Sequence, residues 1–367
     1  MKKIIKKVML LGTDISLAAV LVSGVYVGNY LIPQKGIKTA TVSAMHTDTP
    51  MVPVMENWDA NLSTLKQTTL PEQQSLISQN GLKFTSVIKD STDWHKKFAD
   101  HFTSSVVSTD TSYTSPNISI QIKKKEYDSG VLDYSAKGKH LRYGTNIAYI
   151  MADIYVGDIS CLQTAFAQDT YGIGYSEKLS DMSSVIGSVL AVNGDSYNNN
   201  LQQENGTIIR NGIIYRNQQT NMETCVLNWD GTMQIYAPGQ LDTQALINNG
   251  AYQSWLFGPS LLDENGKAKK VFLTEDYIKQ SHPRTAIGYF EPGHYCLLVV
   301  DGRQNDYSRG MFLQEEAAIF EQLGCKVAYN LDGGHCSFMT MYDQVISHPY
   351  KPKHKVPDGI FIMEQEV

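Results

Sequence analysis

Asn330-Leu331-Asp332-Gly333-Gly334-His335-Cys336-Ser337 follows directly on a short apolar run, residues 325–329. Gly324 before that run and the double glycine after it are typical of the two ends of a buried strand. An amide, a carboxylate and two glycines therefore stand where a strand ends.

The residues before this stretch predict a strand followed by a helix. Residues 295–300 form an apolar run that ends in the charged turn Asp301-Gly302-Arg303. Residues 311–323 are predicted to be a helix that Gly324 ends, with one apolar face made of Leu313, Ala317, Phe320 and Leu323. Strand, helix and strand in this order predict a right-handed crossover between parallel strands. We therefore expect an α/β (mixed α+β) fold whose mixed sheet contains at least one parallel βαβ unit.

In such a sheet Asp301 and Asp332 would lie at the same edge, where open α/β sheets usually bind ligands. Their carboxylates would be roughly 5–10 Å apart, depending on whether another strand intervenes. That range includes the separations found in retaining and in inverting glycosidases. The alternative is that each Asp-Gly pair only forms a turn.

The N-terminus predicts a membrane anchor. Four lysines precede a largely apolar run, residues 8–32, which is long enough to span a bilayer with the N-terminus in the cytoplasm. A cleaved signal peptide is the alternative. We expect residues 1–33 to be a cytoplasmic tip and a single transmembrane signal-anchor, 34–111 a stalk with some helix, and 112–367 an extracellular catalytic domain.

Charge excludes some partners. Without residues 1–33 the chain has 27 basic and 36 acidic side chains, a net charge of −9. An acidic ectodomain without basic clusters argues against nucleic acid as a partner and against docking on anionic lipid.

Polar and charged residues also stand at the ends of other predicted strands. The run at residues 189–192 ends in Asn193-Gly194-Asp195, and Arg284 stands just before another predicted strand. Arginine binds phosphate in a bidentate manner, so Arg284 and Arg303 are candidates for binding a phosphate group. The alternative is that each forms a structural ion pair with one of the aspartates.

Six motifs taken together resemble a known family. They are Asn193-Gly-Asp195, Arg210-Asn-Gly212, Phe257-Gly-Pro259, Arg284-Thr-Ala-Ile-Gly288, Val300-Asp-Gly-Arg303 with Ser308-Arg-Gly310, and Asn330-Leu-Asp-Gly-Gly334. In this order, over roughly residues 112–364, they resemble the phosphodiester glycosidase family, which includes the lysosomal uncovering enzyme and bacterial exopolysaccharide-associated members. The family pattern usually continues with another glycine and a serine, where this chain has His335-Cys336-Ser337.

The resemblance implies hydrolysis of the bond between an anomeric carbon and a phosphodiester oxygen, with a carbohydrate phosphodiester as substrate. It implies catalytic roles for Asp332, Asp301 and Asp195. The implied substrate-binding residues are Arg284, Arg303, Asn193, Gly194, Asn330, Gly333, Gly334, Ser308 and His335. Carboxylates near the reacting carbon would stabilise an oxocarbenium-like transition state.

No metal or cofactor follows with certainty from the sequence. His335 could be an acid, a base, a metal ligand or an incidental loop residue. Several aspartates at one edge could hold Ca²⁺ or Mg²⁺. The five cysteines show no zinc-binding spacing, and Cys296 and Cys325 are expected in the core.

Two other functions stay open at this stage. The chain could be a non-catalytic glycan-binding or exopolysaccharide assembly protein of the same fold. It could also transfer the sugar to a glycan hydroxyl in place of water.

Overall fold

The computed structural model describes residues 92–197, 205–242, 246 and 250–365, together with the short strands β1 (Ile37–Lys38) and β2 (Lys83–Phe84). The apolar run at residues 8–32 lies outside these residues. Within the described ranges, no helix has the length and apolar character that crossing a membrane requires. The described fold therefore does not include the predicted transmembrane helix, and the cellular location stays a prediction.

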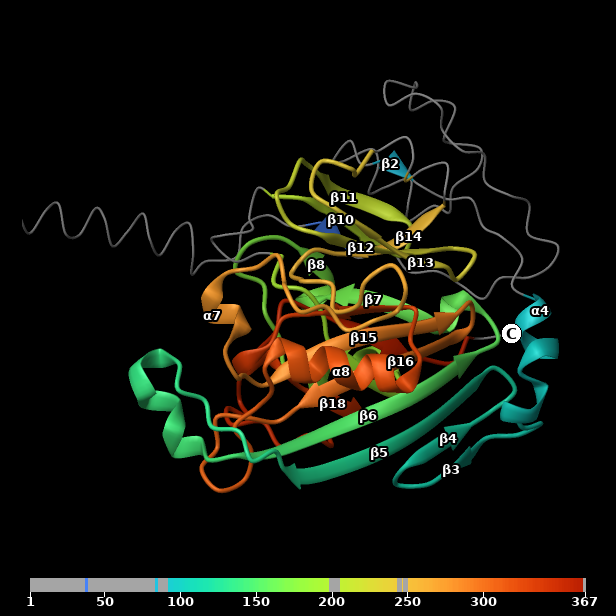
Figure 1. Ribbon diagram of the computed structural model, residues 1–367. Helices are drawn as coiled ribbons and strands as arrows, with labels where there is room; N and C mark the ends of the chain where they lie inside the picture. The colour runs from blue at the N-terminus through green and yellow to red at the C-terminus, as the bar shows by residue number, and fades with distance from the viewer. Residues whose placement is uncertain are drawn as a thin grey trace, which may run out of the picture.

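The largest sheet has seven strands in the order β17-β15-β16-β6-β5-β4-β3 (Figure 1). Its strands are β3 (Val107–Ser108), β4 (Ser112–Thr114), β5 (Ile118–Asp128), β6 (Asn146–Val156), β15 (Arg284–Glu291), β16 (His294–Val300) and β17 (Val327–Asn330).

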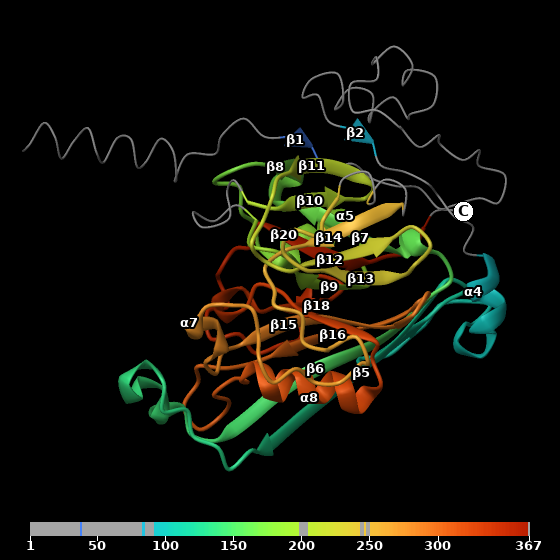
Figure 2. The same ribbon diagram turned by 45° about the horizontal axis from the view of Figure 1, so that its top comes forward.

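A five-stranded sheet has the order β19-β18-β9-β20-β7, and smaller sheets stack beyond it (Figure 2). The five strands are β7 (Leu162–Phe166), β9 (Leu190–Asn193), β18 (Met339–Met341), β19 (Gln344–Val345) and β20 (Asp358–Ile362). The smaller sheets contain β8 (Thr170–Tyr171), β10 (Thr207–Arg210), β11 (Ile213–Asn217), β12 (Thr224–Asn228), β13 (Met233–Tyr236) and β14 (Ala251–Trp255).

Helices are short and few in the described part of the chain. They include the α-helices α4 (Thr92–Lys97), α5 (Leu179–Ile186), α7 (Asp276–Lys279) and α8 (Leu313–Leu323). Single turns of 3₁₀-helix are η2 (Ala99–His101), η4 (Ile159–Cys161), η5 (Ala167–Asp169) and η6 (Gly334–Cys336), and the longer η3 is Ala136–Tyr143.

The predicted α/β class with a parallel βαβ unit is wrong. Every strand pair described is antiparallel, so the fold is mostly β. The predicted strand–helix–strand order is present as β16, α8 and β17, but β15 lies between the two strands and is antiparallel to both. β16 and β17 therefore run in the same direction without sharing a ladder.

The two faces of β16 explain why its sequence is apolar without interruption. Tyr295, Leu297 and Val299 lie in the main core, which also contains residues of the five-stranded sheet and of β12, β13 and β14. Cys296, Leu298 and Val300 lie on the opposite face in a second core with Leu313, Ala317 and Phe320 of α8. A strand that is buried on both faces loses the alternation of apolar and polar residues, whether its neighbours are parallel or antiparallel.

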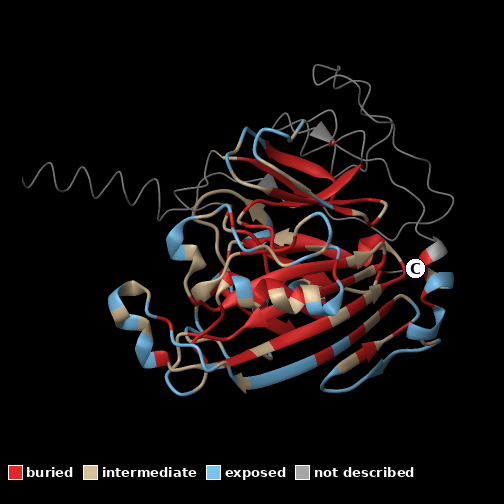
Figure 3. Ribbon diagram, viewed as in Figure 1, coloured by how far each residue is buried: buried red, intermediate tan, exposed pale blue. Residues whose placement is uncertain are grey.

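Burial decreases toward the edges of the fold. Figure 3 shows the central strands buried and much of β5 exposed.

The helix α8 is buried through Leu313, Ala317 and Phe320, whereas Leu323 is 43% exposed and does not continue the predicted apolar face. Gly324 ends the helix with φ +81, as expected for a left-handed C-cap. Trp94 and Phe98, which precede the predicted domain start near Ser112, also lie in the main core.

Candidate active site

A cavity of about 500 Å³ opens beside the loop that follows β17. Asp332, Gly333, Gly334 and His335 line it, as do Arg284 and Arg303. Six of the twelve predicted site residues thus line one cavity. The wall is completed by Ser176, Ser196, Phe257, Tyr277, Ile278, His282, Pro283, Cys336, His354, Lys355 and Pro357.

The double glycine lets the loop pass close to the start of β15. A Cβ on Gly333 would lie 2.7 Å from the carbonyl oxygen of Pro283, so a side chain there would collide with backbone. Gly334 adopts φ +65, and its N–H donates to the same carbonyl at 2.9 Å. Glycine is needed at both positions because one requires space and the other a left-handed conformation.

Neighbouring backbone groups fix the position of Asp332. Its N–H donates to the carbonyl of Gly194 at 3.1 Å, and the side-chain amide of Asn193 donates to the Asp332 carbonyl at 2.6 Å. Asn193 also accepts from Thr285 and from the N–H of Phe338. This buried amide therefore positions the loop after β17 and does not itself line the cavity.

Burial raises the pKa of Asp332 to about 7. A hydrogen bond from the Cys336 thiol opposes the shift, and the nearby carboxylates of Asp195 and Asp358 add to it. A cluster of three carboxyl groups resists full ionisation because each negative charge disfavours the next.

The two supporting carboxylates lie behind Asp332. Asp195 is 1% exposed and accepts from the N–H of Leu256 at 2.7 Å, while Asp358 accepts from the N–H of Asp195 at 2.7 Å. Arg210 forms a buried ion pair with Asp358, with 3.1 Å between Nε and Oδ2. The prediction of Asp195 as a catalytic residue is not supported by its place in the structure, since it is bonded to backbone and lies outside the cavity wall.

Asp358 was missed by the sequence analysis. It begins β20 and is followed by Gly359, so it repeats the Asp-Gly pattern of the other candidate residues. A Cβ on Gly194 would lie 2.7 Å from the Asp358 carboxylate, which explains why glycine separates Asn193 from Asp195.

Asp301, Ser308 and Asn330 do not line the cavity. The Asp301 carboxylate accepts from the Tyr307 hydroxyl and from the N–H of His348, both at 2.9 Å. Ser308 donates to the Asp301 carbonyl, and the side chain of Asn330 donates to the Gly258 carbonyl. These three predicted site residues hold loops in place. β15 lies between the strands that Asp301 and Asp332 follow, which corresponds to the wider of the two predicted separations, and Asp301 does not line the cavity.

Arg284 and Arg303 have different surroundings. Arg284 is 2% exposed and donates to the carbonyls of Met311, Ile278 and Gln280, with Glu316 at 3.9 Å. Burial lowers its pKa to about 10. Although Arg284 lines part of the cavity, its hydrogen bonds indicate a structural role.

Arg303 is half-buried at the cavity wall, with φ +59 in the backbone. Its guanidinium donates to the hydroxyls of Tyr350 at 2.6 Å and Tyr277 at 3.0 Å. It also lies beside the double glycine, since a Cβ on Gly334 would be 3.3 Å from it. Left-handed backbone at a non-glycine residue is uncommon and is often found at functional sites.

His282 lies beside Arg303 on the cavity wall and forms a hydrogen bond with it. Its Nε2 donates to the carbonyl of Tyr277 at 2.8 Å, so its Nδ1 can accept from Arg303. Burial, followed by the charges of Arg284 and Arg303, lowers the pKa of His282 to about 3. The neighbouring Ser281 is held by the buried carboxylate of Asp133, which also bonds His140 at 2.7 Å.

The comparisons with known proteins agree with this arrangement. Residues 187–363 match the family model described as phosphodiester glycosidase. This part of the chain, just under half of it, is similar to the phosphodiester glycosidase family. The resemblance stated from the six motifs is therefore confirmed, and the family match supports a glycosidase-type function.

A curated relative from Bacillus subtilis (strain 168), the SPbeta prophage-derived uncharacterized protein YomE, is 31% identical over 177 residues. The match covers 47% of this chain and 26% of that protein, so the chain spans about a quarter of the relative's length.

A solved structure shares the fold. It is the zebrafish N-acetylglucosamine-1-phosphodiester alpha-N-acetylglucosaminidase catalytic domain, auto-inhibited by its pro-peptide. The similarity has a TM-score of 0.51 at 20% identity and covers 69% of this chain and 90% of that one. At this identity the likeness establishes the fold and not the substrate.

Proposed function

We propose that this chain hydrolyses the glycosidic bond of sugar-1-phosphodiesters, with Asp332 as the catalytic carboxylate and Arg303 as the phosphate-binding group. The observation that carries the proposal is that the two side chains line the same cavity, on the two sides of the double glycine. A carboxylate and a guanidinium in one cavity suit a substrate that combines a reacting anomeric carbon with an anionic leaving group.

Asp332 is the one carboxylate on the cavity wall among the described residues. Glycosidases that cleave an alcohol leaving group need a second carboxyl group to protonate it. A phosphodiester leaves as a stable anion and needs no such acid. One carboxylate in the cavity is therefore sufficient for this substrate class.

In the proposed reaction, Asp332 accepts a proton from water while the water oxygen bonds to the anomeric carbon. The bond between that carbon and the phosphate oxygen breaks, and the phosphate oxygen keeps the electron pair. The positive charge of Arg303 stabilises the negative charge that forms on the phosphate. Lys355, an exposed residue on the same wall, adds a second positive charge.

Tyr277 extends the proposed phosphate site. Its hydroxyl accepts from Arg303, and a hydroxyl that accepts one hydrogen bond can still donate its own proton. Tyr277 and Arg303 together would supply a fixed donor pair. Preorganised donors of this kind contribute strongly to transition-state stabilisation, because they need no reorganisation during the reaction.

The test uses the purified full-length chain with sugar-1-phosphodiesters, including UDP-N-acetylglucosamine, and measures released sugar. The parent should release sugar, and the rate of sugar release by Asp332→Asn should be at least a hundred-fold lower. Asp343→Asn changes an exposed aspartate and is the matched control, with the rate of the parent. An Asp332→Asn protein with full activity would overturn the proposal, and glycan binding without release by the parent would favour the non-catalytic alternative.

A further inference from the structure

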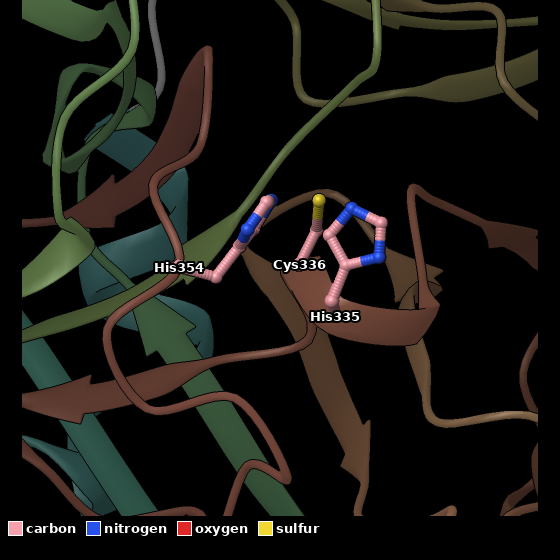
Figure 4. Close-up of side chains that lie close together, drawn as sticks. All are labelled: His335, Cys336 and His354. Carbon is pink, nitrogen blue, oxygen red and sulfur yellow. The ribbon is translucent and has the colours of Figure 1, made fainter.

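Three side chains with nitrogen and sulfur donors meet at one end of the cavity. They are His335 and Cys336 of η6 and His354 from the loop before β20. Their donor atoms all lie within 4.8 Å of one another. In Figure 4 the three side chains are directed toward the same small volume. Among the described residues, no other set of three or more His, Cys, Asp or Glu side chains brings its donor atoms so close.

The imidazoles of the two histidines meet edge to face and are not stacked. The imidazoles of His335 and His354 have centroids 4.0 Å apart and are inclined at 81°. His335 is half-buried, His354 is half-buried and Cys336 is 6% exposed, so the group is screened from bulk water but open on one side to the cavity.

The donor set identifies the class of metal. Two imidazoles and a thiolate suit Zn²⁺, whereas Ca²⁺ and Mg²⁺ take oxygen ligands. Tetrahedral zinc with bonds of about 2.0–2.3 Å brings its ligand atoms to about 3.5 Å from one another. Side-chain rotations that move the donor atoms by about 1 Å would reach this spacing from the observed positions.

We propose that His335, Cys336 and His354 form a zinc site with three protein ligands and a fourth position facing the cavity. The site goes beyond the proposed glycosidase function and does not depend on it, because it is inferred from the donor atoms alone. A site with three protein ligands and one open position is the arrangement of zinc sites that bind a water or a substrate.

Zinc binding requires that the Cys336 thiol lose its proton. The Cys336 thiol donates a hydrogen bond to Asp332. When Zn²⁺ binds, a zinc–sulfur bond forms, and the thiol proton leaves to Asp332 or to solvent.

The experiment uses the untagged full-length chain, stripped with a chelator and then titrated with Zn²⁺ or Co²⁺. Metal analysis after dialysis should find one zinc per chain. Cobalt should give a near-ultraviolet thiolate-to-metal charge-transfer band, which reports Cys336 directly. Zinc binding should also release a proton, seen as a binding enthalpy that changes with the ionisation enthalpy of the buffer.

Variants separate this site from adventitious binding. Cys336→Ala and His354→Gln should each weaken zinc binding by at least ten-fold, and Cys336→Ala should also remove the charge-transfer band. His348→Gln replaces an exposed histidine outside the cluster and should bind like the parent. Unfolding curves check that each variant is folded. Failure of the folded parent to bind zinc, or unchanged affinity in both ligand variants, would overturn the zinc site.

The outcome is independent of sugar release. A chain that binds zinc through Cys336 but releases no sugar would retain the zinc site and remove the glycosidase proposal. A chain that releases sugar but binds no zinc would retain the glycosidase proposal and remove the zinc site.

Discussion

Nδ1 of His282 lies 3.0 Å from a terminal nitrogen of Arg303, while Nε2 of the same ring lies 2.8 Å from the Tyr277 carbonyl. Because the arginine can only donate, Nδ1 must be the acceptor and Nε2 must carry the proton. A neutral histidine of defined tautomer therefore orients the guanidinium that faces the cavity.

The first prediction concerns this orientation. Replacing His282 with alanine removes the acceptor that holds Arg303, so phosphate binding should weaken. We expect KM for a sugar-1-phosphodiester to rise by roughly ten-fold or more, as for a lost hydrogen bond to a charged group, with a smaller fall in kcat. Steady-state kinetics of His282→Ala beside His348→Gln measure this. Unchanged KM in a folded His282→Ala protein would show that His282 does not position Arg303.

The loop at residues 330–337 could be predicted from sequence because it depends on local signals. A short apolar run, a carboxylate and two glycines placed Asp332, Gly333 and Gly334 at a strand end, and all three line the cavity. The helix was also predictable, since α8 ends at Leu323 before Gly324. These features depend on residues that are close together in the chain.

Features that depend on distant segments could not be predicted. The insertion of β15 between β16 and β17 leaves no trace in the residues of either strand, so the antiparallel pairing of both strands with β15 was not predicted. His354 lies in a loop without periodic pattern, and its approach to His335 follows only from the position of β20. Arg284 was predicted to bind phosphate, but the carbonyls that it binds belong to segments before and after β15.

A second prediction concerns the buried Glu316, which lies 3.9 Å from Arg284. Burial raises its pKa from 4.5 to about 8, although Arg284 opposes the shift. Between these two pH values the folded protein holds more protons than the unfolded chain. The free energy of unfolding should therefore fall as pH rises from about 4.5 to about 8.

Glu316→Gln removes this titration. Relative to the parent, the variant should gain on the order of 3–4 kcal/mol in the free energy of unfolding between pH 5 and 8, since one pKa unit corresponds to about 1.4 kcal/mol. Urea unfolding at both pH values measures the gain. Glu126→Gln, at an exposed glutamate, should show no such gain, and a parallel pH dependence of Glu316→Gln and parent would contradict the prediction.

A third prediction concerns the ion pair of Arg210 and Asp358, whose side chains are 0% and 1% exposed. Asp358→Asn leaves a buried guanidinium without its negative partner. We expect a loss of about 3 kcal/mol in the free energy of unfolding, as is typical when one partner of a buried pair is removed. Chemical denaturation of Asp358→Asn and of the surface control Asp343→Asn tests this, and equal stabilities would contradict it.

A fourth prediction concerns stereochemistry. Since Asp332 is the one cavity-lining carboxylate in the described part of the chain, water should displace the phosphate directly. The first sugar formed should therefore have the opposite anomeric configuration to the substrate. Proton NMR of the product, recorded before mutarotation, distinguishes inversion from retention. Retention would indicate a covalent intermediate and a different role for Asp332.

The most direct test of the central claim is to identify which bond breaks. UDP-N-acetylglucosamine is incubated with the full-length chain in water enriched in heavy oxygen, and the nucleotide product is analysed by mass spectrometry. Cleavage at the anomeric carbon predicts free N-acetylglucosamine and unlabelled UDP from the parent, and neither product from Asp332→Asn. Heavy oxygen in the nucleotide product, or sugar phosphate in place of free sugar, would show cleavage at phosphorus and would contradict the assignment as a glycosidase.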